Sequence, residues 1–430
     1  MEEIKQEQTR RQKAFLVGIQ NQQWNRSEVE DHLVELASLT ETLDIEVLGQ
    51  EVVRIDRPVA KLYLGTGKAE QVRARAQTSG ADLLIFDVEL SPLQQRNWET
   101  FAEVETIDRQ EVIIDIFAQR AHTREARLQV ELAQLQYQLP RLRHAWSHLE
   151  RQRGGTMHRG GPGERQIEVD RRRIREQITR SRRQLKDLRR QRDLRRQSRR
   201  DRPVPTAAIV GYTNAGKSSL LRRLTNAEVL IEDKLFATLD TTTRRITLPN
   251  NQPLLLTDTV GFIRKLPHQL VESFKATLEE ATEADFLIHV LDVTHPKAGE
   301  HARVTMDVLE ELAAGGKLMI VVLNKMDLPH DPLQVNQLQR EYELCVPVST
   351  HTGEGIQDLL DALARHFVLP LKQYELVIPH ERFDLVDLVH REGEILEENH
   401  EADGAHIETV FPERFQAQIE PFITNGRDTD

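Results

Sequence analysis

Apolar and polar positions alternate in short blocks over the first quarter of the chain. Buried-strand patterns occupy residues 14–19, 45–53, 82–87 and 104–107, and stretches with helical apolar spacing separate them. Strand–helix alternation of this kind is typical of a parallel sheet covered by helices. The pattern therefore predicts a small parallel α/β domain over residues 1–108, in which Ser27 caps the first helix.

Residues 65–68 of this region read Gly-Thr-Gly-Lys, and two interpretations of them are open. The two glycines could form a second phosphate loop, or a tight turn that begins the following helix. Only half of a nucleotide-binding motif is present, and this favours the turn.

The apolar spacing becomes helical from residue 111. Apolar side chains then recur at alternating intervals of four and three, at Leu128, Leu132, Leu135, Leu139, Leu142, Trp146 and Leu149. A second seam follows at Ile174, Ile178, Leu185 and Leu188, after a glycine-rich stretch at residues 154–163. Heptad seams on both sides of a flexible loop are typical of two helices that pack along each other. The pattern predicts an antiparallel helical hairpin over residues 109–202, whose first arm is about 33 Å long.

Pro203 and Pro205 mark the next boundary, because proline ends a helix. Apolar strands, each followed by a polar loop, return beyond them and predict a doubly wound α/β domain over residues 203–369. Residues 370–430 carry weaker patterns, which predict a small α+β appendage. In that appendage we expect strands near 376–378 and 405–410, a helix over 383–391, and an acidic run at 392–401 that only adds solubility.

Composition and charge restrict the class of protein. The chain has 430 residues, 39% of them hydrophobic and 30% charged, and it contains one cysteine, Cys345. It has neither an apolar run long enough for a membrane span nor a signal-peptide core at its start. The single cysteine excludes an internal disulfide and suits a reducing compartment, so we expect a cytoplasmic protein. We also expect a monomer without stable membrane insertion.

The charge is distributed unevenly. Residues 171–202 have a net charge of +12, so the rest of the chain carries −23 of the overall −11. A single-signed run repels itself unless a polyanion neutralises it, and stacking aromatics are nearly absent here. This favours contact with the backbone of folded RNA over a merely solvated helix face. The candidate RNA contacts are His158, Arg159, Arg165, Arg171, Arg172, Arg173 and Arg175.

A phosphate-loop motif of the form G-x-x-x-x-G-K-S lies between the predicted strand at 207–210 and a helix. Its residues are Gly211, Tyr212, Thr213, Asn214, Ala215, Gly216, Lys217 and Ser218. Backbone N–H groups of such a loop surround a phosphate, the lysine adds a positive charge, and the serine hydroxyl can hold Mg²⁺.

Four further motifs follow at the ends of predicted elements, in the order of a guanine-nucleotide switch domain. The first loop contains Phe236, Ala237, Thr238, Leu239 and Asp240, and the second contains Asp258, Thr259, Val260 and Gly261. Thr238 is a candidate second ligand for Mg²⁺, Asp258 can hold the ion through water, and the Gly261 N–H can meet the γ-phosphate. We expect Lys217, Thr238 and Gly261 to act in hydrolysis.

The other two motifs concern the base. They contain Asn324, Lys325, Met326 and Asp327, and then Ser349 and Thr350. The Asp327 carboxylate can accept hydrogen bonds from guanine N1–H and its exocyclic amine, which adenine lacks, and a backbone N–H at 349–350 can meet the guanine oxygen. The set predicts a GTP- and GDP-binding GTPase.

At these motifs the chain resembles the HflX family of translation-associated GTPases, within the Obg–HflX group. The likeness rests on Asp-Val-Glu-Leu-Ser-Pro-Leu-Gln-Gln at 87–95, Leu-Gln-Val-Glu-Leu-Ala-Gln-Leu at 128–135, Gly-Pro-Gly-Glu at 161–164 and Asp-Thr-Val-Gly-Phe-Ile-Arg at 258–264. The resemblance implies binding to the large ribosomal subunit and its rRNA, and splitting of stalled ribosomes under stress such as heat shock. Thr241 and Thr350 depart from the proline and alanine usual in the family.

Two features concern the mechanism. Phe262 stands where many small GTPases have a water-orienting glutamine, so we expect slow intrinsic hydrolysis that the ribosome stimulates. Asn214 resembles the loop asparagine of potassium-activated GTPases, so K⁺ is a candidate cofactor beside Mg²⁺. The alternative function is an NTP-dependent RNA-remodelling or ribosome-assembly factor.

Overall fold

The computed structural model contains two compact units, which we describe separately. It describes residues 12–145, 162–197, 204–225, 235–236, 239, 241–265, 280–366, 371–401, 403–412 and 415–427. The first unit comprises Met1–Gln197, Glu232–Asp240 and Lys265–Ala276, and the second comprises Ser198–Ile231, Thr241–Arg264 and Thr277–Asp430. The finer division into four domains remains a prediction.

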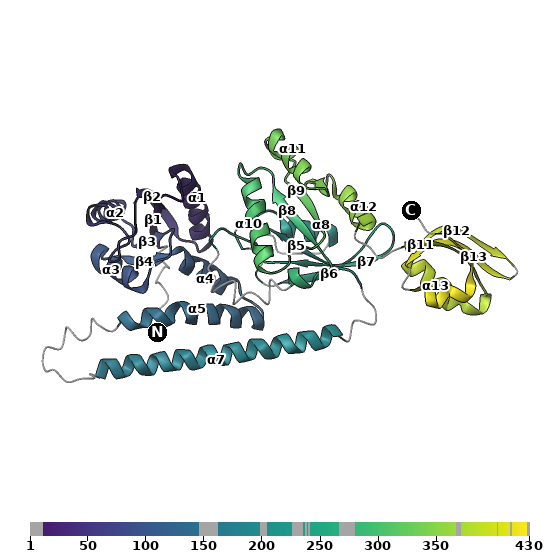
Figure 1. Ribbon diagram of the computed structural model, residues 1–430, viewed down its shortest axis with the longest axis horizontal. Helices are drawn as coiled ribbons and strands as arrows, with labels where there is room; N and C mark the ends of the chain where they lie inside the picture. Colours follow the sequence, from purple (N-terminus) through teal and green to yellow (C-terminus); the bar gives the residue numbers. More distant parts are fainter. Residues whose placement is uncertain are drawn as a thin grey trace, which may run out of the picture. The chain divides into compact units, whose positions relative to one another are not determined.

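A four-stranded parallel sheet forms the centre of the first unit (Figure 1). Its strands are β1 (Lys13–Gln20), β2 (Glu46–Arg54), β3 (Leu83–Phe86) and β4 (Glu105–Asp108), in the order β2-β1-β3-β4. The helices of this region are α1 (Arg26–Thr42), α2 (Thr66–Ser79), α3 (Pro92–Ala102) and α4 (Arg109–Arg120). The small parallel α/β domain expected from the sequence is therefore confirmed.

Of two local predictions for this region, one is wrong and one is confirmed. The prediction that Ser27 caps α1 is wrong, because the cap is Asn25. The Asn25 side chain accepts from the Glu28 N–H, and the Glu28 carboxylate accepts from the Asn25 N–H, which satisfies two backbone donors at once. At residues 65–68 the turn is confirmed: Gly65 is the N-cap of α2, and the Lys68 ammonium donates to the Arg54 carbonyl oxygen.

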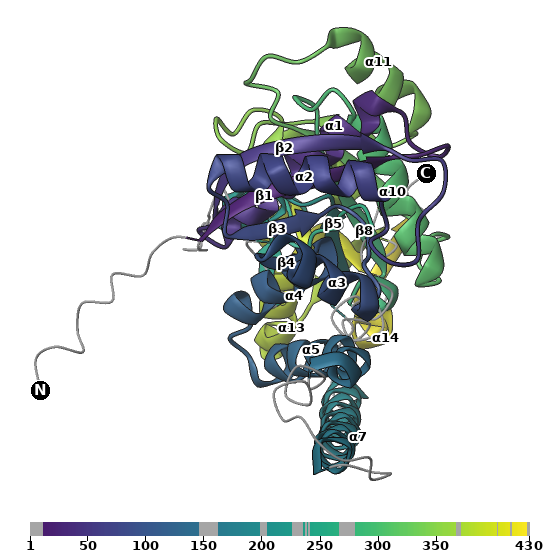
Figure 2. The same ribbon diagram turned by 90° about the vertical axis from the view of Figure 1, so that its left-hand side faces the viewer.

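The helical hairpin is present as α5 (Arg124–Ala145) and α7 (Pro162–Gln197), which lie side by side in both views (Figure 1; Figure 2). Leu132 and Leu135 of α5 pack with Ile178 of α7, so the two heptad seams meet as expected. The helical stretch expected from residue 111 is divided into α4 and α5 because Thr123 accepts from the Ala126 N–H and starts a new helix. The predicted tip, with His158 and Arg159, lies outside the described residues.

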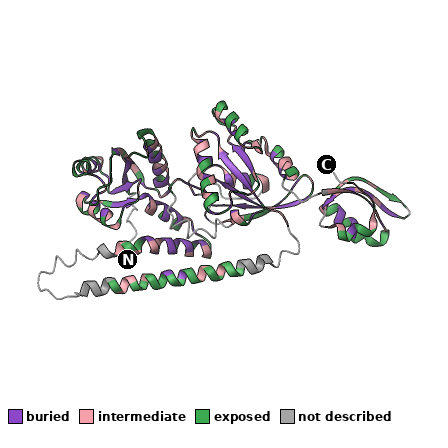
Figure 3. Ribbon diagram, viewed as in Figure 1, coloured by how far each residue is buried: buried purple, intermediate pink, exposed green. Residues whose placement is uncertain are grey.

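Exposed residues dominate α7 where its side chains are described (Figure 3). This helix has 36 residues and is therefore about 54 Å long. It is long but polar, and among the described residues no helix combines the length and apolar character needed to cross a membrane.

Two described residues of the predicted nucleotide-domain loops pack within the first unit. The Phe236 ring meets Phe117 edge-on, with 4.7 Å between ring centroids. The Lys265 ammonium lies 2.5 Å from Asp87 Oδ2, and Asp87 Oδ1 pairs with Arg109 at 2.9 Å. Asp87 comes directly after β3, at the carboxyl edge of the parallel sheet.

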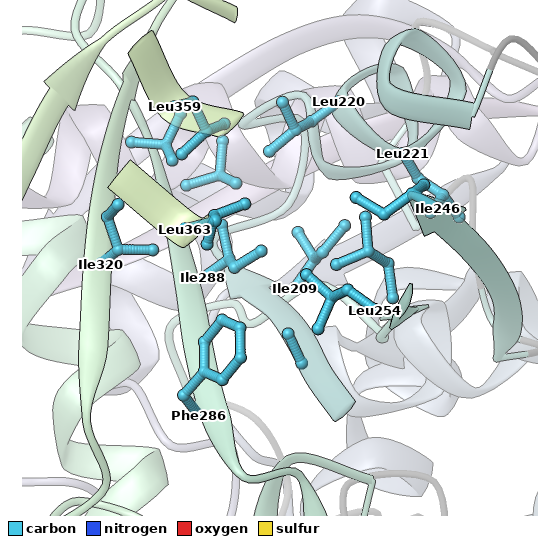
Figure 4. Packing of buried hydrophobic residues seen from close by; sticks show 14 of the residues in the cluster. Ile209, Leu220, Leu221, Ile246, Leu254, Phe286, Ile288, Ile320, Leu359 and Leu363 are labelled. Carbon is cyan, nitrogen blue, oxygen red and sulfur yellow. The ribbon is translucent and has the colours of Figure 1, made fainter. Parts of the chain in front are cut away.

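A six-stranded sheet with the order β10-β9-β8-β5-β7-β6 organises the second unit. Its strands are β5 (Thr206–Gly211), β6 (Thr242–Thr247), β7 (Pro253–Asp258), β8 (Phe286–Asp292), β9 (Met319–Asn324) and β10 (Cys345–Pro347). Among the described strands of this six-stranded sheet, only β6 runs antiparallel to its neighbour. The helices are α8 (Lys217–Thr225), α10 (Ala298–Glu311), α11 (Pro332–Glu341) and α12 (Ile356–His366). One face of the sheet packs Ile209 and Ile288 against Leu220 of α8 and Leu363 of α12 (Figure 4), as a doubly wound fold requires.

The C-terminal part of the second unit is an antiparallel sheet with the order β12-β13-β11-β14. Its elements are β11 (Leu371–Ile378), α13 (Phe383–Glu392), β12 (Glu394–Glu401), β13 (Gly404–Pro412) and β14 (Ile423–Arg427). The α+β expectation is confirmed. The interpretation of the acidic run as a mere solubilising segment is wrong, because residues 394–401 form β12 at the edge of the sheet.

Candidate nucleotide-binding site

The phosphate-loop motif connects β5 to α8, as its sequence context indicates. Gly211 and Gly216 have φ values of 147° and 97°, which L side chains rarely adopt. A Cβ on Gly211 would lie 2.3 Å from the Val290 carbonyl oxygen, and one on Gly216 would lie 2.1 Å from Asn324 Nδ2. Glycine is therefore required at both ends of the loop by backbone conformation and by space.

Lys217 begins α8, and its side chain turns back under the loop. Its Nζ donates to the carbonyl oxygens of Gly211 at 3.1 Å and Tyr212 at 2.7 Å. The side chain is buried, and this desolvation lowers the pKa of Lys217 to about 8, against an opposing effect of Asp258. A buried cation at the N-terminus of a helix is suited to an anionic ligand.

Ser218 and Asp258 bring two hard oxygen ligands together at the phosphate loop. The Ser218 hydroxyl donates to Asp258 Oδ2 at 2.7 Å, across 40 residues of chain. Asp258 ends β7 and is 1% exposed. A hydroxyl and a carboxylate fit Mg²⁺, which prefers oxygen ligands.

The segment after Asp258 is hydrogen-bonded to the phosphate loop through its backbone. The Phe262 N–H donates to the Gly211 carbonyl at 3.1 Å, and the Thr213 N–H donates to the Phe262 carbonyl at 2.8 Å. A Cβ on Gly261 would lie 2.9 Å from both Lys217 Nζ and the Thr213 Cα, so only glycine fits there. The Phe262 ring is 1% exposed and packs in the core with Ala208 and Val210. Thr259 is fixed by its hydroxyl bond to the Ile209 carbonyl, and Val260 is buried.

The residues predicted to contact the base converge at the ends of β9 and β10. Asn324 Nδ2 donates to the Ala215 carbonyl at 2.9 Å, and its Oδ1 accepts from the Thr350 N–H at 3.1 Å. The Thr350 N–H, one of the two donors considered for the guanine oxygen, is therefore used by Asn324 in this structure. The Ser349 hydroxyl donates to Asp327 Oδ1 at 2.6 Å, and this hydrogen bond is the main cause of a pKa of Asp327 below its ordinary value.

Sequence reasoning missed Asp292, which ends β8 beside this group. Lys325 has a positive φ of 68°, and its Nζ lies 2.6 Å from Asp292 Oδ2. Thr294 donates to Asp292 Oδ1 from its N–H at 2.9 Å and from its hydroxyl at 2.6 Å. The signal was the position of Asp292 after a buried strand, at the same sheet edge as Asn324.

Not every predicted site residue falls within the structure. Ala237, Thr238 and Asp240 lie outside the described residues, whereas Leu239 is buried and Phe236 packs in the first unit. Arg165 belongs to α7, but its side chain is not described. Three of the candidate RNA contacts on α7 are exposed, Arg172, Arg173 and Arg175, and Arg171 is half-buried. In the base-binding loop, Met326 follows β9, and its N–H donates to the Val348 carbonyl.

This fold and this edge of the sheet define a P-loop nucleotide-binding domain with the motif set of a GTPase. Three family models match the chain: GTP-binding GTPase N-terminal over residues 30–118, GTP-binding GTPase Middle Region over 120–199, and 50S ribosome-binding GTPase over 206–325. Curated relatives match over nearly the whole length. The GTPase HflX of Akkermansia muciniphila is 46% identical and covers 99% of this chain and 100% of the relative.

The GTPase HflX of Escherichia coli is 41% identical over 87% of this chain and 88% of the relative. The chain belongs to the HflX family of GTPases, and it is a GTP-hydrolysing enzyme. Among solved structures, SsGBP in complex with GDP has a TM-score of 0.48 and 25% identity, covering 82% of this chain and 98% of that one.

Proposed function

We propose that this GTPase binds the large ribosomal subunit and uses GTP to split stalled or idle ribosomes, under stress such as heat shock. The observation that carries the proposal is the exposed, arginine-rich α7 in a chain that also contains a GTPase domain. Two further observations support it: the whole-length likeness to HflX GTPases, and the match of residues 206–325 to a model described as a 50S ribosome-binding GTPase.

The nucleotide site supports GTP and GDP binding with Mg²⁺. Ser218 and Thr238 would hold the ion directly, and Asp258 would hold it through water. When bound, Mg²⁺ neutralises charge that develops on the phosphates. Lys217 would contact the outer phosphates, the Gly261 N–H would meet the γ-phosphate, and Asp327 would accept from the guanine N1–H and amine.

Slow intrinsic hydrolysis is part of the proposal. The Phe262 ring is buried in the core and cannot orient a water by hydrogen bonding. A missing transition-state group costs several kcal/mol, which leaves room for strong stimulation by the ribosome. GTP turnover with and without large subunits tests this step, and equal rates would contradict it.

A potassium ion is the second proposed cofactor. Asn214 is exposed on the loop at a φ of 60°, beside the expected phosphate position, and its side-chain carbonyl is the candidate ligand. A monovalent cation there would supply charge where other GTPases use an arginine. Turnover in K⁺ should exceed turnover in Na⁺ at equal ionic strength; identical rates would remove K⁺ from the proposal.

The splitting proposal requires the arginine-rich hairpin to bind rRNA while the nucleotide site holds GTP. The excess of arginines over carboxylates on this exposed helix favours the phosphate backbone of folded RNA. The decisive experiment is sedimentation of intact ribosomes with the protein and GTP, GDP or a non-hydrolysable GTP analogue. We expect free subunits with GTP and with the analogue, and intact ribosomes with GDP. Intact ribosomes in all three samples would refute the function.

A further inference from the structure

Tyr212, the second residue of the phosphate loop, is stacked on a helix that none of the nucleotide motifs includes. Its ring lies parallel to the imidazole of His301, with 3.8 Å between centroids and 1° between planes. His301 is on α10, and both side chains are more than nine-tenths buried. A parallel stack at this distance fixes the plane of the tyrosine ring.

The hydroxyl of the same tyrosine contacts the segment that follows Gly261. Tyr212 Oη accepts from the Arg264 N–H at 3.0 Å. The Arg264 guanidinium also reaches back to α10, where its Nη1 lies 3.5 Å from Glu300 Oε2. Thus α10 contacts the phosphate loop through His301 and the segment after Gly261 through the preceding residue, Glu300.

The consequence concerns the backbone between these contacts. Phe262 is hydrogen-bonded on both sides of Tyr212, to Gly211 and Thr213. The Tyr212–Arg264 bond extends this attachment by two residues, so the peptide at Gly261 is held from its C-terminal side. Gly261 therefore directly precedes a segment that is attached around Tyr212 at both Phe262 and Arg264.

We infer that His301 is a positioning residue for GTP hydrolysis, which acts through Tyr212 on the Gly261 segment. The inference rests on the proposed contact of the Gly261 N–H with the γ-phosphate. Burial, followed by His295 and then by the charges of Arg264 and Lys297, lowers the pKa of His301 to about 3, so the stacked ring is neutral at physiological pH. An aromatic ring of similar size should therefore replace it.

The test uses the full-length protein with Mg²⁺ and GTP, and measures kcat, KM and the dissociation constant of fluorescent GDP. Tyr212→Phe keeps the stack but removes the acceptor for the Arg264 N–H, and His301→Ala removes the stack. We expect each to lower kcat about fivefold, because Tyr212→Phe removes the hydrogen bond to Arg264 and His301→Ala lets the tyrosine ring move away from it. KM and GDP affinity should stay within about twofold of wild type. His301→Phe should restore kcat. Asp307→Ala, on the exposed side of α10, is the matched control.

Three results would overturn the inference: wild-type kcat in both Tyr212→Phe and His301→Ala, a parallel loss of kcat and GDP affinity, or a His301→Phe protein no faster than His301→Ala. Gly261→Ala separates this inference from the site on which it rests. If Gly261→Ala hydrolyses GTP normally, the proposed γ-phosphate contact is wrong. If only Gly261→Ala is impaired, the contact stands and the role of His301 falls.

Discussion

The Lys325 ammonium lies 2.6 Å from Asp292 Oδ2; Asp292 ends β8, and Lys325 directly follows the neighbouring parallel strand β9. Asp292 is itself oriented by two hydrogen bonds from Thr294. The pair therefore fixes a lysine whose own backbone has the left-handed conformation, two residues before Asp327.

Replacing Asp292 by alanine should weaken GDP binding about fivefold, because Lys325 would lose its ionic partner and its fixed position. The magnitude corresponds to about 1 kcal/mol for one partly exposed charge-assisted contact. Titration with fluorescent GDP measures it, and Asp358→Asn on the exposed face of α12 is the control. Unchanged affinity would mean that the ion pair has no part in holding the base site.

Lys217 predicts a pH dependence of nucleotide binding. Burial lowers the pKa of its ammonium to about 8 in the nucleotide-free chain, whereas phosphate binding favours the charged form. Above pH 8 the lysine must take up a proton when GDP binds, so affinity should fall as pH rises. Titrations from pH 7 to about pH 9 should show a loss approaching tenfold per pH unit above the pKa. A Lys217→Ala protein, weak at every pH, should have a flat profile. A wild-type profile equally flat would contradict the assignment.

Asp87 predicts a large effect on stability. It is 1% exposed and pairs with Arg109, which is 3% exposed, and with Lys265. Asp87→Ala leaves the Arg109 charge buried with less compensation, and breaking such a pair costs about 3–5 kcal/mol. Lys265→Ala should cost much less, because 29% of that side chain is exposed to water. Urea unfolding of both variants measures the difference. Equal midpoints would show that Asp87 is not the centre of this network.

Much of this architecture follows from local sequence patterns. The strand–loop–helix around Gly211 and Lys217 was predictable because phosphate loops need glycine at fixed positions. The hairpin was predictable because heptad spacing places Leu132 and Ile178 on facing seams, where they meet. Each of these signals is a spacing between residues that are close together along the chain.

The predictions that failed did so for two physical reasons. Either two neighbouring residues were equally suited to the same role, or the deciding contact joins residues that are far apart along the chain. Ser27 and Asn25 are both good caps, and the reciprocal bond to Glu28 decides between them. The acidic strand β12 is an exposed sheet edge, so its pairing with β13 leaves no strong apolar alternation in the sequence. Asp292 and His301 gain their importance only when the sheet brings them to Lys325 and Tyr212.

The exposed arginines of α7 provide the prediction that most directly tests rRNA binding. Replacing Arg172, Arg173 and Arg175 by alanine should weaken binding to large subunits and abolish splitting, while basal GTP turnover stays at the wild-type rate. If all three contact phosphates, the slope of log affinity against log salt should fall by about 2–3. The matched control replaces three exposed arginines outside the hairpin, Arg75, Arg303 and Arg340. Because both triple variants lose the same net charge, a similar loss in each would indicate only general electrostatic attraction. An unchanged affinity and salt slope in the α7 variant would place the ribosome contact elsewhere on the chain.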